Sequence, residues 1–170
     1  MKAVGTNIDL SSALIVEDDR AMQRRLQHLL TELIDADAKI TIAGNLAEAH
    51  AYLDNNASGL ALIDIGLPDG SGIDLIARLH QHRPGVTSVV VSAWGHEDTV
   101  LAALHAGATG YLLKERDDIE LSIALQSIRR GGAPIDPNIA RRILALLPDA
   151  PSTSATPTAA ALGSNRPLRA

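Results

Sequence analysis

The sequence contains no cysteine and no phenylalanine, and its only aromatic residues are one Trp and two Tyr. Without Cys, the chain forms no disulfide and offers neither a thiolate metal ligand nor a Cys nucleophile. So few rings argue against a base-stacking platform for nucleic acid. The hydrophobic core must therefore be built from Leu, Ile, Val and Ala.

The sequence also lacks a basic excess and a long apolar run. The net charge is -5 over 170 residues, so these residues have no overall basic surface for nucleic acid. No apolar run approaches the roughly 18 residues that a membrane-spanning helix requires. The first residues lack the apolar region of a signal peptide. We therefore expect a cytoplasmic protein without a membrane partner.

The composition is 46% hydrophobic and 21% charged, which is typical of a globular domain that buries a core. The acidic excess lies in residues 1–116, which hold nine Lys or Arg against fifteen Asp or Glu. Residues 149–170 are mostly Ala, Ser, Thr and Pro, without apolar periodicity. We expect an N-terminal arm over 1–10, a domain over 11–132, a linker helix over 133–148 and a flexible tail over 149–170.

Short apolar segments alternate with segments of helical periodicity along the domain. The predicted strands are 13–16, 39–43, 59–63, 86–91 and 109–113. The predicted helices are 20–34, 46–53, 72–82, 98–105 and 117–129. This alternation predicts an α/β fold, in which helices cover both faces of a parallel sheet.

Polar residues follow four of the predicted strands. They are Glu17, Asp18 and Asp19 after the first strand, Asp64 after the third, Ser92 after the fourth and Lys114 after the fifth. Parallel sheets bind ligands at the carboxyl ends of their strands. We therefore expect carboxylate, hydroxyl and ammonium groups to meet at one edge of the sheet.

These groups suit the transfer of a phosphoryl group to a carboxylate. Clustered carboxylates are hard oxygen ligands for Mg²⁺, which offsets the repulsion between an anionic nucleophile and a phosphoryl donor. Lys114 can bind one phosphoryl oxygen and the Ser92 hydroxyl another. Asp64 is then the nucleophile and forms an acyl phosphate.

Four segments, 14–19, 61–72, 89–93 and 110–114, resemble the receiver domain of bacterial two-component response regulators. The resemblance implies a flavodoxin-like, doubly wound, five-stranded parallel sheet with strand order 2-1-3-4-5. It also implies that Asp64 accepts a phosphoryl group from a histidine kinase. Such a domain is a signalling module and not an enzyme, apart from its own phosphorylation and autodephosphorylation.

The resemblance assigns roles to individual residues. Asp18 and Asp64 would bind Mg²⁺ directly, Glu17 would help hold the metal through water, and Gly66 would provide its backbone carbonyl. Lys114 would sense the phosphoryl group. Ser92 would be the switch hydroxyl and Tyr111 the switch aromatic, which turns inward when Ser92 moves towards the phosphoryl group.

Two positions in this family influence the lifetime of the phosphoryl group, and here they are Gly66 and Trp94. Gly66 has no side chain to position an attacking water, and Trp94 is large enough to shield the site. We therefore expect slow autodephosphorylation. Glu115 replaces the Pro that often follows the lysine, so we do not expect a cis peptide bond after Lys114.

The segments 110–114 and 131–142 are similar to regulators of the NarL/LuxR type. Asp136 is a suitable N-cap, Pro137 suits the first position of a helix, and the apolar residues Ile139, Ile143, Leu144 and Leu147 follow. The resemblance implies a linker helix and then a DNA-binding domain, which these residues do not contain. We favour a truncated regulator that contacts DNA only through that domain and forms a homodimer on phosphorylation.

Two other classes of function are alternatives. A stand-alone receiver would act by protein contact or as a phosphate sink, and the reading frame beyond Ala170 distinguishes it from a truncated regulator. A phosphatase or mutase that uses an aspartyl phosphate needs an acid two residues after its nucleophile, where this chain has Gly66.

Each candidate residue also has a purely structural interpretation. Asp64, Asp18 and Glu17 could cap helices, and Lys114, Ser92 and Tyr111 could be ordinary surface, loop and strand residues, respectively. The six histidines show no metal-binding spacing, and the glycines after Asp64 do not form a P-loop. The joint occurrence of carboxylates, hydroxyl and lysine favours the functional interpretation.

Overall fold

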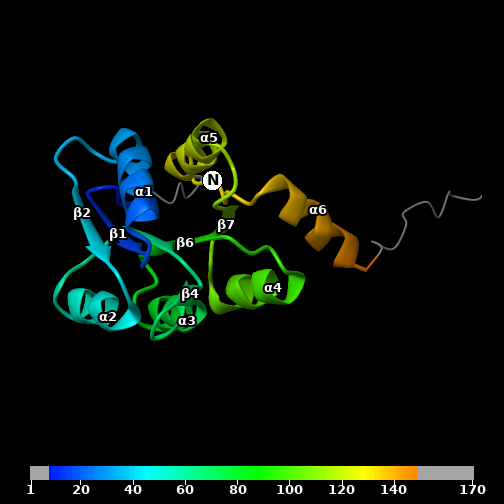
Figure 1. Ribbon diagram of the computed structural model, residues 1–170, viewed down its shortest axis with the longest axis horizontal. Coiled ribbons are helices and arrows are strands. Elements are labelled where there is room, and N and C mark those ends of the chain that lie inside the picture. The colour runs from blue at the N-terminus through cyan, green and yellow to red at the C-terminus, as the bar shows by residue number, and fades with distance from the viewer. Residues whose placement is uncertain (1–7, 149–170) are drawn as a thin grey trace, which may run out of the picture.

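The computed structural model describes residues 8–148 and contains a five-stranded parallel sheet between two layers of helices (Figure 1). Its strands are β1 (Ser12–Val16), β2 (Lys39–Ala43), β3 (Leu60–Ile63), β6 (Thr87–Ser92) and β7 (Gly110–Leu113). Their order across the sheet is β2-β1-β3-β6-β7. Numbered along the chain, these five strands have the predicted order 2-1-3-4-5, so the predicted flavodoxin-like fold is confirmed.

Helices α1 and α5 cover one face of the sheet, and α2, α3 and α4 cover the other (Figure 1). The helices are α1 (Arg20–Leu33), α2 (Leu46–Asn55), α3 (Gly72–His82), α4 (Glu97–Ala106), α5 (Asp118–Arg129) and α6 (Pro137–Leu146). The ends of α1–α5 and of the five strands lie within two residues of the predicted ends. The alternation of apolar and helical segments in the sequence therefore predicted all five strands of the sheet and all five helices that cover its two faces.

The sheet separates two hydrophobic cores, because successive residues of a strand face opposite sides. In β1, Leu14 and Val16 pack in the core under α2, α3 and α4, whereas Ala13 and Ile15 pack in the core under α1 and α5. All four side chains are fully buried. A parallel strand that is covered on both faces has to be apolar throughout, which explains the short continuous apolar runs.

Side-chain caps determine where several helices begin. The Asp19 carboxylate accepts a hydrogen bond from the Met22 amide at the start of α1. Asn45, Ser71 and Asp117 cap α2, α3 and α5 in the same way. Each cap satisfies an amide of the first turn that has no partner inside the helix.

The Gly- and Pro-containing segment after Asp64 forms a small hairpin. Its two strands, β4 (Gly66–Leu67) and β5 (Gly70–Ser71), pair in antiparallel fashion. Between them, the Asp69 carboxylate accepts hydrogen bonds from the backbone amides of Leu46 and Ala47 at the start of α2. The hairpin thereby ties the segment that follows Asp64 to the neighbouring helix.

The segment before α6 extends the edge of the sheet. Ile135 forms a parallel bridge with Tyr111, whose amide donates to the Pro134 carbonyl at 2.8 Å. The Asp136 carboxylate is buried, caps α6 and pairs with Arg116 through two hydrogen bonds of 2.5 and 3.0 Å. Burial alone would raise the pKa of Asp136, but the Arg116 guanidinium and the backbone amides at the start of α6 together hold that pKa below its ordinary value.

Helix α6 begins at Pro137, after the predicted cap at Asp136. The predicted apolar residues do not share one environment: Ile139 is buried and Ile143 packs against the core, whereas Leu144 and Leu147 are 67% and 56% exposed. The tail predicted over 149–170 lies outside the described residues. The predicted domain boundaries stay a prediction.

Gly72, the first residue of α3, lies against the backbone of Asp64. A Cβ atom at Gly72 would lie 2.1 Å from the Asp64 carbonyl oxygen, whereas at Gly85 no described atom would lie within 4 Å. We predict that Gly72→Ala lowers the free energy of unfolding by about 1–3 kcal/mol, because the backbone must move. The control Gly85→Ala should be neutral or stabilise by less than about 1 kcal/mol. Urea unfolding measures both, and equal effects would contradict the steric argument.

Candidate functional site

The carboxyl ends of the central strands lie together, because β1 and β3 are paired in register at Val16 and Ile63. Backbone hydrogen bonds continue the ladder one residue beyond the strands. The Asp64 amide donates to the Val16 carbonyl and the Lys114 amide to the Ser92 carbonyl, each at 2.9 Å. The sheet therefore holds the backbone of Asp64 and Lys114, the first residues after β3 and β7.

Three carboxylates meet at this edge. One carboxylate oxygen from each of Glu17, Asp18 and Asp64 lies within 4.8 Å of the other two. Glu17 and Asp64 are buried, with 1% and 8% of their surface exposed, whereas Asp18 is exposed. The cluster predicted from the sequence is thus present, with two members inside the protein and one at its surface.

The Lys114 ammonium lies between two of these carboxylates. Its Nζ is 2.6 Å from Glu17 Oε2 and 3.0 Å from Asp64 Oδ2. Such contacts are strong because both partners are charged and largely shielded from water. Lys114 is therefore not an ordinary surface lysine but offsets the negative charge of the cluster.

Burial and charge act together on the ionisation of this site. Burial raises the pKa of Glu17 above its ordinary value, and the hydrogen bond from Lys114 opposes that rise. For Lys114, burial alone would lower the pKa, but hydrogen bonds to Glu17 and Asp64 outweigh it and raise that pKa. Lys114 is therefore a permanent cation at neutral pH.

The donor set fits a hard divalent cation. Carboxylate oxygens are the ligands that Mg²⁺ prefers, and the exposed Asp18 leaves one side of the cluster open to solvent. A hollow of about 460 Å³ opens beside Asp18 and is also lined by Arg20, Gln23 and Arg24. The hollow therefore gives an ion or a small phosphate compound access to Asp18, the exposed member of the cluster.

Ser92 and Tyr111 lie next to this cluster and are both buried. Ser92 Oγ accepts a hydrogen bond from the Trp94 amide at 3.2 Å, and the Tyr111 hydroxyl donates to the Trp94 carbonyl. Burial also raises the pKa of Tyr111. We expected Tyr111 to turn inward only after Ser92 moves, but the structure already has it inside the core.

Trp94 covers the segment that follows Asp64. A Cβ atom at Gly66 would lie 3.2 Å from the Trp94 ring, although 57% of the Trp94 surface is exposed. The indole therefore lies against Gly66. A Cβ atom at Gly66 would require the ring to shift by a few tenths of an ångström.

Sequence reasoning missed Arg25, which organises the loop after Lys114. Its guanidinium donates to the backbone carbonyls of Lys114 and Arg116 and pairs with Asp118 at 2.5 Å. Arg25 lies on α1, about ninety positions before these partners. Only the packing of α1 against α5 brings them together, and no local pattern around Arg25 signals it.

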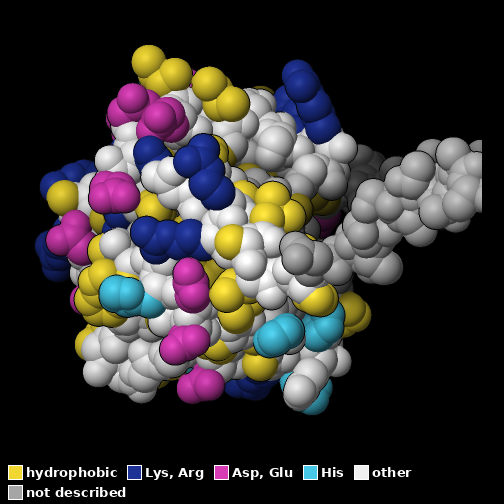
Figure 2. Space-filling view, turned by 90° about the vertical axis from the view of Figure 1, so that its right-hand side faces the viewer, with side chains coloured by type: hydrophobic (Ala, Val, Ile, Leu, Met, Phe, Trp, Pro, Cys, Tyr) yellow, Lys and Arg dark blue, Asp and Glu magenta, His cyan; other side chains and the backbone are white. Residues whose placement is uncertain are grey.

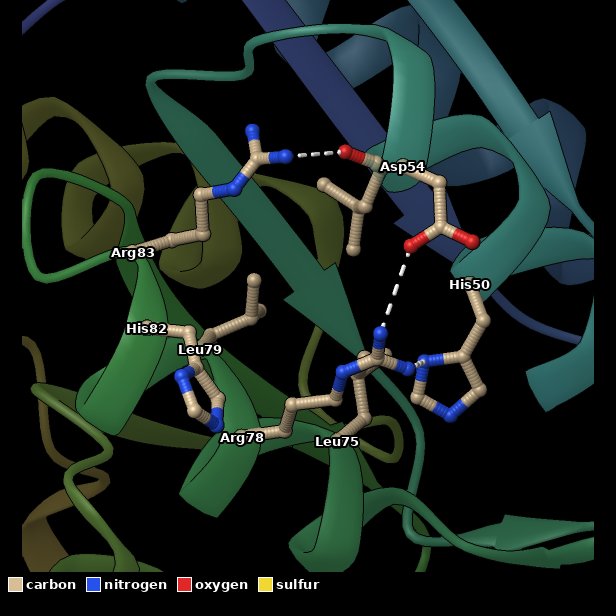
Figure 3. Close-up of a pocket in the computed structure, with 8 residues that line it drawn as sticks. His50, Asp54, Leu75, Arg78, Leu79, His82 and Arg83 are labelled. Carbon is tan, nitrogen blue, oxygen red and sulfur yellow. Dashed lines mark hydrogen bonds and ion pairs between the residues drawn. The ribbon is translucent and has the colours of Figure 1, made fainter.

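A second hollow, of about 270 Å³, lies between α2 and α3 (Figure 3). Both arginines that line it are paired: Arg78 contacts His50 Nδ1 at 2.6 Å and Asp54 at 3.2 Å, and Arg83 donates to the Leu53 carbonyl. These contacts tie the two helices together. The hollow is therefore better explained as helix packing than as a ligand site.

The comparison with protein families identifies the chain. The model of the response regulator receiver domain matches residues 13–126, which include all the site residues described above. The chain therefore belongs to the response regulator receiver family. In this family the domain is a signalling module of two-component systems, which agrees with the resemblance seen in the sequence.

Curated relatives include transcriptional regulators. The chain is 30% identical over 136 residues to the DNA-binding transcriptional activator DevR/DosR of Mycobacterium tuberculosis and 35% identical over 121 residues to the transcriptional regulatory protein KdpE of Staphylococcus aureus. The alignments cover 78% and 71% of this chain but only 61% and 50% of the relatives. The chain thus spans about half to three-fifths of the length of these relatives.

Solved structures support the same fold. A CheY-like receiver domain from Methanospirillum hungatei matches with a TM-score of 0.63 and 28% identity, over 70% of this chain and 93% of that one. A LuxR-family response regulator from Aurantimonas matches with a TM-score of 0.70 and 24% identity, over 79% and 95% of the two chains. Because relatives of several subtypes match, the comparisons leave the NarL/LuxR assignment as a proposal.

Within residues 8–148, no helix is long and apolar enough to cross a membrane.

Proposed function

We propose that Asp64 accepts a phosphoryl group from a histidine kinase in a reaction that requires Mg²⁺. The observation that carries this proposal is the Lys114 ammonium beside Asp64 and Glu17, within a cluster of three carboxylates. A permanent cation next to a buried carboxylate provides the charge that a transferred phosphoryl group requires. Mg²⁺ would supply the further positive charge that draws an anionic donor to an anionic nucleophile.

In this reaction an Asp64 carboxylate oxygen forms a bond to phosphorus as the phosphorus–nitrogen bond of the phosphohistidine breaks. The electron pair of that bond leaves with the imidazole nitrogen of the kinase, and the product is an acyl phosphate. Lys114 and the Ser92 hydroxyl would each bind one phosphoryl oxygen. Asp18, Asp64, Glu17 and the Gly66 carbonyl would hold the metal.

Phosphorylation would then shift the population of two arrangements of the domain. Ser92 would move towards the phosphoryl oxygen, and the inward position of Tyr111 would be stabilised. The chain would thereby change its contacts around α4 and β7. The structure contains the inward position of Tyr111, which we assign to the phosphorylated population.

The output of this switch would be dimerisation and transcriptional control. Two isoleucines four residues apart on α5, Ile119 and Ile123, are 72% and 67% exposed and suit an apolar contact between protomers. Figure 2, which views the molecule from the right-hand side of Figure 1, shows hydrophobic side chains among the charged ones at this surface. We propose that the chain is the receiver part of a NarL/LuxR-type regulator, whose DNA-binding domain lies outside these residues.

Asp64→Asn should abolish phosphorylation, because an amide is not the nucleophile that a carboxylate is. Incubation with Mg²⁺ and acetyl phosphate, followed by intact-mass measurement, should add one phosphoryl group to the wild type and none to the variant. Asp74→Asn is the matched control, because it makes the same change on the neighbouring helix α3. Labelling of the Asp64→Asn variant would contradict the proposal.

Asp18→Asn should weaken Mg²⁺ binding by roughly tenfold or more, because it removes a charged ligand. Trp94 is the only Trp, so its emission during a Mg²⁺ titration reports the site. Asp19→Asn is the control, since Asp19 caps α1 and an Asn can serve as that cap. An equal loss of affinity in both variants would show that Asp18 has no special role.

Trp94→Ala should shorten the lifetime of the acyl phosphate, on the order of tenfold, by opening the site to water. The conservative variant Trp94→Phe keeps a ring over Gly66 and should retain most of the lifetime. The measurement is the decay of phosphorylated protein in Mg²⁺ after removal of the donor. A wild-type half-life of seconds that does not change in Trp94→Ala would refute the shielding role.

A further inference from the structure

The loop between β6 and α4, residues 93–96, is held on its inner side by the site. The Trp94 amide donates to Ser92 Oγ, and the Trp94 carbonyl accepts from the Tyr111 hydroxyl. Both polar groups of the Trp94 backbone are therefore bound to the two residues of the proposed switch. A displacement of Ser92 or Tyr111 must change the path of this loop.

Helix α6 holds the next residue of the same loop from the outer side. Arg142 Nη1 donates to the Gly95 carbonyl at 3.2 Å. A Cβ atom at Gly95 would lie 3.5 Å from two atoms of the Ile139 side chain and 3.3 Å from Leu113. Ile139 is only 2% exposed, so its side chain is packed inside the protein beside Gly95.

The start of α6 is anchored to the sheet, and this anchor holds Ile139 and Arg142 beside Gly95. The Tyr111 carbonyl accepts from the Asp136 amide at 2.9 Å, and the Asp136 carboxylate pairs with Arg116. Figure 1 shows α6 leaving the edge at β7 and lying beside α4. Tyr111 thus contacts the loop through its hydroxyl and the start of α6 through its backbone.

We propose that α6 is a coupling helix: its grip on Gly95 and a phosphoryl group on Asp64 stabilise the same arrangement of residues 93–96. This inference rests on the proposed function. Docking of α6 favours phosphoryl binding and does not oppose it. The reason is that the arrangement held by α6 has Tyr111 inside the core and bound to the Trp94 carbonyl. By thermodynamic reciprocity, docking of α6 strengthens phosphoryl binding by the factor by which the phosphoryl group strengthens docking.

The coupling can be measured with beryllofluoride, which mimics the phosphoryl group, in the presence of Mg²⁺. Isothermal titration calorimetry should show that the variant carrying Ile139→Ala and Arg142→Ala binds the mimic at least about fivefold more weakly than the wild type. Arg142→Ala alone should lie in between. Arg141→Ala is the matched control, because it removes the same charge from an exposed position of the same helix and should leave affinity unchanged.

The position of α6 can be followed directly. Because the chain has no Cys, the substitutions Gln27→Cys on α1 and Ala145→Cys on α6 create two unique spin-labelling sites, both exposed. Pulsed electron spin resonance should give a distance distribution that narrows when the mimic binds. In the variant with Ile139→Ala and Arg142→Ala, the distribution should be broad with or without the mimic.

The outcomes separate this inference from the proposed function. If the wild type does not bind beryllofluoride with Mg²⁺, the proposed function fails. If the wild type binds it and the variants bind equally or more tightly, the coupling is refuted while the proposed function stands. An unchanged distance distribution on binding would refute it as well.

Discussion

The Lys114 ammonium between Glu17 and Asp64 is the interaction on which the rest of this site depends. Two buried carboxylates a few ångströms apart repel each other, and burial disfavours their charged forms. Lys114 contacts both and keeps a charged cluster inside the protein. The same cation can bind a phosphoryl group, so the group that stabilises the resting site also serves the chemistry that we propose.

The parallel sheet makes this contact possible. Glu17, Asp64 and Lys114 are separated by about fifty positions from one to the next, yet each follows a strand directly. In-register pairing of β1 with β3 brings the ends of these strands to one edge. Arg25 on α1 then fixes the backbone after Lys114, in the layer of helices that α1 forms with α5. The geometry of the site therefore reflects both the sheet and the helices that cover it.

The edge of the sheet at β7 joins the site to the C-terminal helix. Tyr111 lies at the centre of this connection, because its hydroxyl contacts the loop beside Ser92 and its backbone contacts residues 134 and 136. Switch, loop and α6 therefore share one set of hydrogen bonds. Such continuity provides a route by which a local charge at Asp64 would affect a distant part of the chain.

The sequence by itself determined the order of strands and helices, the identity of the cluster and the start of α6, because these follow from local periodicity, strand ends and caps. Only the tertiary structure decided the role of Arg25, the inward position of Tyr111 and the contact of α6 with Gly95. These features join residues far apart in the chain. Their side-chain directions depend on how the layers pack, which no local pattern encodes.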